Sequence, residues 1–155
     1  MNSFSPRITV ATVVEKDGRF LLVRERSGSS LVLNQPAGHV EAGEQLAQAA
    51  WRETLEETAW QVEIQAFLGI YVFQPQLGGP VFHRYCFTGQ ALREDKGQQL
   101  DDGIVEALWL SPEEIRARAG EHRSPLVGRC IQDYLDGRRL PLDVIYQHPW
   151  PLQRA

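Results

Sequence analysis

The chain has 155 residues, of which 43% are apolar and 23% are charged. This composition is typical of a globular protein and excludes wholesale disorder, and the length suits a single domain spanning residues 1–155. Because 16 basic residues face 20 acidic ones, the net charge of −4 provides no global positive field that would attract nucleic acid or an anionic membrane. A polyanionic substrate would therefore need local arginines or bound metal ions.

The N-terminal segment, residues 1–6, is short and polar, and no later stretch is long and apolar enough to span a membrane. We therefore expect a cytoplasmic protein without a membrane partner. Its assembly state, a monomer or a small homo-oligomer, is left open by the sequence.

The first elements expected in chain order are strands. Residues 8–15 and 20–23 are rich in β-branched and aliphatic side chains, and the turn residues between them predict a β-hairpin. Residues 31–33 predict another short strand. Residues 34–43 contain two glycines and a proline, so we expect a loop there.

A helix is expected next, over residues 44–58, because this stretch has good helix formers and no glycine or proline after residue 43. At roughly 100° per residue, such a helix divides into two faces. One face gathers Ala47, Trp51, Leu55 and Thr58. The opposite face carries three carboxylates, those of Glu53, Glu56 and Glu57.

Two long strands are expected after the helix, at residues 62–73 and 81–92, joined by a turn rich in proline and glycine. A polar loop then leads to a shorter strand at residues 104–110.

The last expected elements are helices. Ser111 and Glu114 form a capping-box pattern with proline at the first helical position, and Ser124 begins a further helix that ends near Asp136. Residues 138–155 are expected to pack irregularly on the surface. Because strands and helices interleave, the expected fold class is α/β, a mixed-sheet α/β/α sandwich.

The three carboxylates carry the main chemical signal. Like charges at i, i+3 and i+4 repel each other by a few tenths of a kcal/mol per pair, and an ordinary solvated acidic face is the competing interpretation. The cluster lies toward the helix C-terminus, where the macrodipole disfavours negative charge, and a glycine- and proline-bearing loop precedes the helix. Both features favour a site for Mg²⁺, with Mn²⁺ as an alternative, because hard cations prefer oxygen ligands and bridge to phosphates.

The spacing Gly38-x5-Glu44-x7-Arg52-Glu53-Thr54-x-Glu56-Glu57-x-Ala59-Trp60 resembles the Nudix box, Gx5Ex7REUxEExGU, in which U is a bulky apolar residue. Segments at residues 34–39, 123–127 and 137–142 resemble the NudJ-type phosphatases of that family. Two positions depart from the box: Ala59 stands where glycine is usual, and Thr54 replaces an apolar residue.

The resemblance implies a Nudix-type α/β/α sandwich with a loop-helix-loop metal site. It implies that Glu53, Glu56 and Glu57 bind divalent ions, with the main-chain carbonyl of Ala37 as a further ligand. Arg52 lies four residues before Glu56, so we expect it to pair with that carboxylate and fix its orientation. Glu44 is expected to hold the loop onto the helix through Arg52, with Gly38 as the structural glycine of the motif. Glu53 is the first candidate for the proton acceptor. The other candidates are Asp101, Asp102 and Glu106.

The activity that the resemblance implies is hydrolysis of phosphoanhydride bonds in nucleoside tri- and diphosphates. A NudJ-like enzyme would also accept hydroxymethylpyrimidine pyrophosphate, an intermediate on the way to thiamine pyrophosphate. Whether phosphate or pyrophosphate is released stays open. Pro75 suggests an ADP-ribose or nucleotide-sugar pyrophosphatase as an alternative, although turns favour proline anyway.

A non-catalytic nucleotide sensor is the alternative from another class, but such domains commonly lose the carboxylates that this chain retains. A capped or triphosphorylated RNA end is a further open alternative, although the net charge disfavours RNA binding.

Weaker signals concern the substrate. Arg24 and Arg26 end the second strand, where arginine suits phosphate binding or ordinary surface charge equally. His39 could reach a terminal phosphate or be structural. Most aromatic side chains of the two long strands are expected in the core, with one available for stacking on a base: Tyr71, Phe73, Phe82 and Tyr85. In the C-terminal segment, Tyr146 and Trp150 could cover a pocket or simply pack that segment down.

Overall fold

The computed structural model describes residues 4–149. The strands are β1 (Arg7–Lys16), β2 (Arg19–Ser27), β3 (Ser30–Asn34), β4 (Ala37–His39), β5 (Trp60–Phe73), β6 (Phe82–Glu94) and β7 (Ile104–Leu110). The helices are α1 (Leu46–Thr58), α2 (Pro112–Ala117) and α3 (Leu126–Leu135), with short 3-10 helices η1 (Ala119–Glu121) and η2 (Leu142–Val144). No helix in this described range is long and apolar enough to cross a membrane. The cytoplasmic location stays a prediction.

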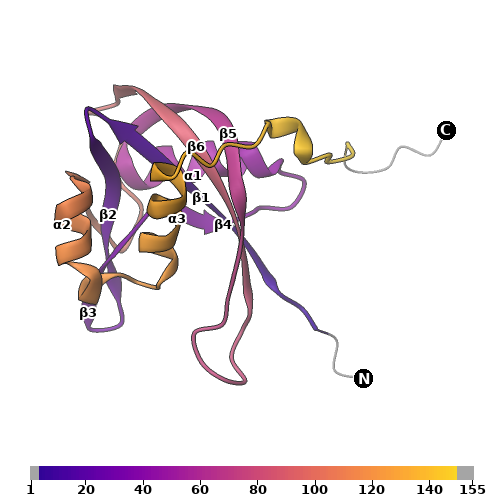
Figure 1. The fold of residues 1–155 in the computed structure, drawn as a ribbon, viewed down its shortest axis with the longest axis horizontal. Coiled ribbons are helices and arrows are strands. Elements are labelled where there is room, and N and C mark those ends of the chain that lie inside the picture. Colours follow the sequence, from indigo (N-terminus) through magenta and orange to yellow (C-terminus); the bar gives the residue numbers. More distant parts are fainter. Residues whose placement is uncertain (1–3, 150–155) are drawn as a thin grey trace.

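The strands form a mixed sheet of order β3-β2-β1-β6-β5, in which β4 also pairs with β1 and β7 also pairs with β2 (Figure 1). β1 and β6 are parallel, whereas the other pairs are antiparallel. β1 pairs with β2 at Glu15 but with β4 at Thr9, so the two long strands diverge and β4 fits between them. This divergence brings the segment around Ala37 beside α1.

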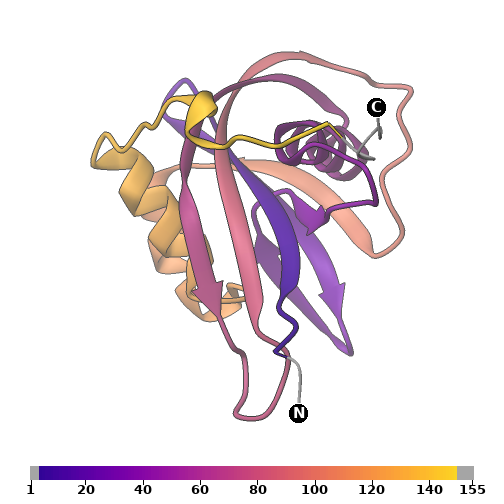
Figure 2. The ribbon, with the colours of Figure 1, turned by 90° about the vertical axis from the view of Figure 1, so that its right-hand side faces the viewer.

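Helices cover both faces of the sheet, which confirms the α/β/α sandwich (Figure 2). Adjacent residues of β1 point to opposite faces. Val10 packs with Ala49 and Ala50 of α1, while Ala11 belongs to the cluster that contains Val127 of α3.

The face of α1 that gathers Ala47, Trp51 and Leu55 is not the buried one. Trp51 is 38% exposed, and the buried arc contains Ala49, Ala50, Glu53, Thr54, Glu57 and Thr58. The alanines let the helix approach the sheet closely, and the Thr54 hydroxyl lies 2.7 Å from the Ala50 carbonyl and 2.9 Å from the Thr12 hydroxyl. Two of the carboxylates therefore face the protein interior.

The two ends of α1 are held in different ways, one by a distant residue and the other by a residue of the motif. The helix begins two residues later than expected, and the Gln147 amide accepts from the Leu46 backbone N–H at 3.1 Å and donates to the Glu44 carbonyl at 2.9 Å. The C-terminal segment therefore packs against α1 and caps it (Figure 2). At the other end, Ala59 adopts φ 61°, the left-handed conformation that normally favours glycine.

The other expected elements are confirmed with small shifts, including the hairpin and the capping box of Ser111 and Glu114. The exception is the loop predicted for residues 34–43, which contains the strand β4. A three-residue strand carries too little alternation to be read from sequence.

Candidate active site

Three carboxylates form a cluster that suits a hard cation. Oxygen atoms of Glu53, Glu56 and Asp101 all lie within 4.8 Å of one another. The loop carrying Asp101 is anchored to the end of α1, because the Asp101 backbone N–H donates to the Glu56 carbonyl at 3.0 Å. An all-oxygen set of this kind matches Mg²⁺ or Mn²⁺.

Glu57 lies beside this cluster, on the buried side of the helix. Its Oε2 accepts from the backbone N–H of Ala37 at 2.9 Å, and the residue is only 7% exposed. The pKa of Glu57 is raised to about 8, mainly by burial and also by the negative charges of Glu25 and Glu53, while the Ala37 hydrogen bond opposes the increase. Burial also raises the pKa of Glu53. A bound cation would offset both effects, so the residues present fit a divalent ion.

Arg52 links four groups of this site. Its Nε and one terminal nitrogen bind the two carboxylate oxygens of Glu44 at 2.7 and 3.0 Å, while the other nitrogen donates to Glu53 at 2.9 Å and to Glu56 at 3.0 Å. It also donates to the His39 carbonyl at 3.1 Å. Hydrogen bonding to Arg52 lowers the pKa of Glu44. The structure thus contains both ion pairs predicted for Arg52.

Gly38 is required by a close approach rather than by its backbone angle. A Cβ atom at this position would overlap the carboxylate of Glu53. β4 can therefore lie against α1 only with glycine here, which explains the first position of the motif.

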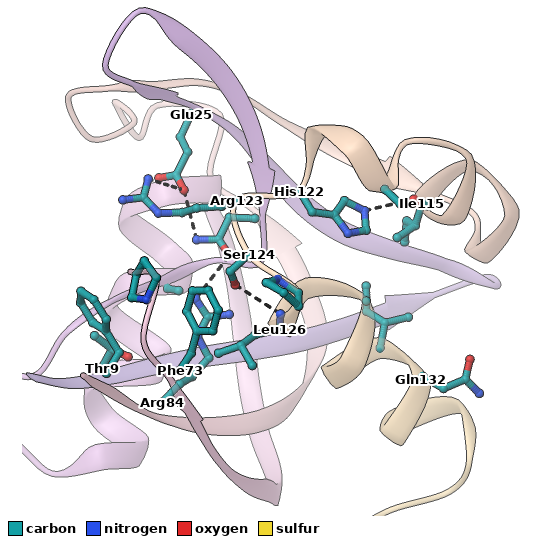
Figure 3. A pocket seen from close by; sticks show the side chains of 18 of the residues that line it. Thr9, Glu25, Phe73, Arg84, Ile115, His122, Arg123, Ser124, Leu126 and Gln132 are labelled. Atoms are coloured by element: carbon teal, nitrogen blue, oxygen red, sulfur yellow. Dashed lines mark hydrogen bonds and ion pairs between the residues drawn. The ribbon is translucent and has the colours of Figure 1, made fainter. Parts of the chain in front are cut away.

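A cavity of about 1010 Å³ opens beside β4, between the sheet and the segment that leads into α3 (Figure 3). Phe73 of β5 and Arg84 of β6 enter it from the sheet, while Arg123 and Ser124 line the opposite wall. The cavity also includes Ala37, Gly38 and His39, so it borders the acidic cluster through β4. One molecule could contact the metal site and the cavity together.

Polar groups inside the cavity form one network. Arg84 donates to Gln35 Oε1 at 2.9 Å and to Asn34 Oδ1 at 3.4 Å. The Asn34 amide donates to Glu25 at 3.1 Å, and Arg123 forms an ion pair with the same carboxylate oxygen at 3.1 Å. None of these five side chains was predicted individually from the sequence as a site residue.

The two arginines predicted to bind substrate do not line the cavity. Arg24 forms an ion pair with Glu106 at 3.1 Å, and Arg26 is exposed at the end of β2. The sequence reveals which side chains of the strand share a face, but it does not reveal which neighbouring segments cover that face. His39 is exposed and does line the cavity.

The remaining predicted residues divide between the site and the surface. Asp101 lies in the acidic cluster. Asp102 is exposed, and Glu106 forms an ion pair with Arg24. Phe73 and Phe82 line the cavity instead of the core. Tyr146 is 81% exposed and does not line the cavity. Trp150 lies outside the described residues.

Comparisons with known proteins agree with this geometry. A family model described as "NUDIX domain" matches residues 4–129. The chain is 38% identical over 152 residues to the protein named Phosphatase NudJ from Shigella boydii and from Escherichia coli K12, covering 98% of this chain and 98% of each relative.

Solved structures show the same similarity. A Nudix hydrolase from Nitrosomonas europaea is 44% identical, has a TM-score of 0.91, and is matched over 95% of this chain and 100% of that one. An ADP-ribose pyrophosphatase from Streptococcus suis has a TM-score of 0.66 over 88% of this chain and 96% of that one, but is 13% identical and shares the fold alone.

Proposed function

The chain belongs to the Nudix family of hydrolases that act on phosphoanhydrides, and on that premise we propose that it is a Mg²⁺-dependent phosphatase of nucleoside tri- and diphosphates. Mn²⁺ is the alternative ion. Hydroxymethylpyrimidine pyrophosphate, an intermediate on the way to thiamine pyrophosphate, is a further candidate substrate. The observation that carries the proposal is the cluster of Glu53, Glu56 and Asp101 bordering a cavity large enough for a nucleotide.

In this proposal, the chain's own residues hold and orient the reacting groups. Glu53, Glu56 and Glu57 would hold the divalent ions, as would Asp101, with the Ala37 carbonyl as a further ligand. A bound divalent ion supplies a more acidic water and neutralises phosphate charge. Arg52 keeps Glu53 and Glu56 in position and thereby orients them for this task.

We assign proton abstraction from the attacking water to Glu53. Its carboxylate lies against Gly38, its pKa is raised by burial, and Arg52 fixes one of its oxygens. Glu106 and Asp102 are weaker candidates, because one is bound to Arg24 and the other is exposed outside the cluster. Asp101 remains the alternative.

The relatives named Phosphatase NudJ support release of inorganic phosphate from the end of the substrate rather than of pyrophosphate. His39, on the cavity side of β4, is the proposed contact for a terminal phosphate.

A substrate panel tests this proposal. GTP, GDP, hydroxymethylpyrimidine pyrophosphate and ADP-ribose would each be incubated with Mg²⁺, and phosphate, pyrophosphate and nucleotide products would be scored separately. We expect phosphate from the first three. AMP from ADP-ribose as the main product would favour the pyrophosphatase alternative, and no product from any of them would contradict the proposed function.

A further inference from the structure

Arg84, near the start of β6, is a buried arginine whose charge has no acidic partner. It is 9% exposed, yet it lines the cavity. A buried guanidinium is costly unless a carboxylate or another anion lies beside it. Within residues 4–149, no acidic side chain forms an ion pair with Arg84. Its hydrogen-bond partners are the neutral amides of Gln35 and Asn34.

The acidic side chain on the cavity wall does not neutralise it. Glu25 lies in the same network, but its Oε1 accepts from Asn34 and forms its ion pair with Arg123. The positive charge of Arg84 therefore remains uncompensated by its described neighbours.

Neutral amides nevertheless fix the guanidinium in place. A guanidinium has five N–H donors in one plane. The contacts to Gln35 and Asn34 use two of them, so donors remain for a ligand in the cavity. Phe73 and Phe82, which pair across β5 and β6, line the same cavity and provide apolar surface for a ring.

We propose that Arg84 binds an anionic phosphate oxygen of the substrate, on the cavity side of β4, while the carboxylates of α1 act on the phosphate chain from the other side. The ligand is a phosphate ester of a group that carries an aromatic ring, as in a nucleotide. The inference rests on the proposed function, because it takes the cavity to be the place of the substrate. It adds the residue that recognises the phosphate ester retained by the nucleotide product, which AMP also carries.

AMP binding without divalent metal tests this role separately from catalysis. Calorimetry in EDTA is expected to show AMP binding by the wild-type protein, and Arg84→Met is expected to weaken it about 10- to 100-fold, the effect of losing a charge-assisted hydrogen bond. Adenosine, which lacks the phosphate, should bind both proteins equally. Arg93→Met provides the matched control, since Arg93 is exposed on the same strand and does not line the cavity.

A second variant keeps Arg84 and changes its partner. Gln35→Glu would place a carboxylate at the atom that already lies 2.9 Å from Arg84, so it should form an internal ion pair and also weaken AMP about 10-fold or more. Both variants would be checked for folding by circular dichroism.

Three results would overturn the inference: no AMP binding by the wild-type protein in EDTA, unchanged affinity in both variants, or an equal loss of adenosine and AMP binding. Because no metal is present, none of these results depends on turnover. Phosphate release with Mg²⁺ therefore reports on the proposed function independently.

Discussion

Arg52 and Arg84 are both largely buried arginines at the candidate active site, yet their surroundings differ in charge. Arg52 contacts the carboxylates of Glu44, Glu53 and Glu56, whereas Arg84 contacts two neutral amides. The first cation is neutralised within the fold and serves to hold other groups. The second is held in place but not neutralised, so its charge is available to a ligand. Buried arginines near one site can thus have opposite roles, and their partners distinguish them.

The largest effect on activity is expected from a change in the carboxylates of α1. Glu57→Gln should reduce Mg²⁺-dependent phosphate release by at least about 100-fold, because losing a ligand should cost at least as much as losing an outer-shell partner. The amide can still accept from the Ala37 N–H, so the fold should be retained. Steady-state kinetics with GDP measure the effect, and near-wild-type turnover would remove Glu57 from the site.

Arg52→Met and Arg84→Met should differ in their effect on stability. Removing Arg52 leaves the largely buried carboxylates of Glu44 and Glu53 without their partner, and we expect a loss of about 3 kcal/mol in the free energy of unfolding. Removing Arg84 leaves no carboxylate unpaired and should cost less. Urea unfolding of both variants measures the difference. Equal losses would contradict the distinction drawn between the two arginines.

The pH dependence of stability offers a third test. The pKa of Glu57 is raised from its ordinary value of 4.5 to about 8 in the folded chain, so the metal-free folded state binds more protons than the unfolded state between these values. Its contribution to stability is therefore fully present below pH 4.5 and is lost as the pH rises through 8.

Urea unfolding in EDTA from pH 5 to 9 should show this decline, at up to about 1.4 kcal/mol per unit of pKa shift. Glu57→Gln should flatten it, and Mg²⁺ should oppose it by favouring the ionised carboxylate. A decline of the same size in the variant would assign the effect to another group.

The smallest effect is expected at the end of α1. Ala59→Gly should raise stability by about 1 kcal/mol, because a left-handed φ of 61° is unfavourable for alanine. Ala47→Gly, inside the same helix, should lower stability by a similar amount. Thermal unfolding compares the two, and destabilisation by both changes would mean that the C-cap conformation is not strained.

Local patterns predicted what depends on near neighbours in sequence. The hairpin, the capping box of Ser111 and the carboxylate spacing on α1 all follow from short-range rules. The Arg52–Glu44 pair was predicted because the two residues lie about two helical turns apart in sequence. The face of α1 that packs against the sheet did not follow from these rules. Trp51 lies outside the buried face, because the small side chains of Ala49 and Ala50 determine how closely the helix meets the sheet.

The cavity depends on contacts between distant segments, which is why its residues were missed. Arg84 looks like any strand arginine until β1 and β6 pair and residues 34–35 reach it. Arg24 was a candidate for phosphate binding because it ends a strand near the motif, but the fold gives it Glu106 as a partner. Asp101 was considered only as a proton acceptor, since nothing local in the sequence places its loop against the end of α1.

Binding of Mn²⁺ is the most direct test of the central claim, that the acidic face of α1 holds a divalent ion for phosphoanhydride cleavage. Electron paramagnetic resonance would follow the loss of free Mn²⁺ signal on titration with the wild-type protein and with Glu56→Gln, whose side chain lies in the cluster with Glu53 and Asp101. The account predicts binding by the wild-type protein and at least about 10-fold weaker binding by the variant. Equal binding by both proteins, or none by the wild type, would contradict it.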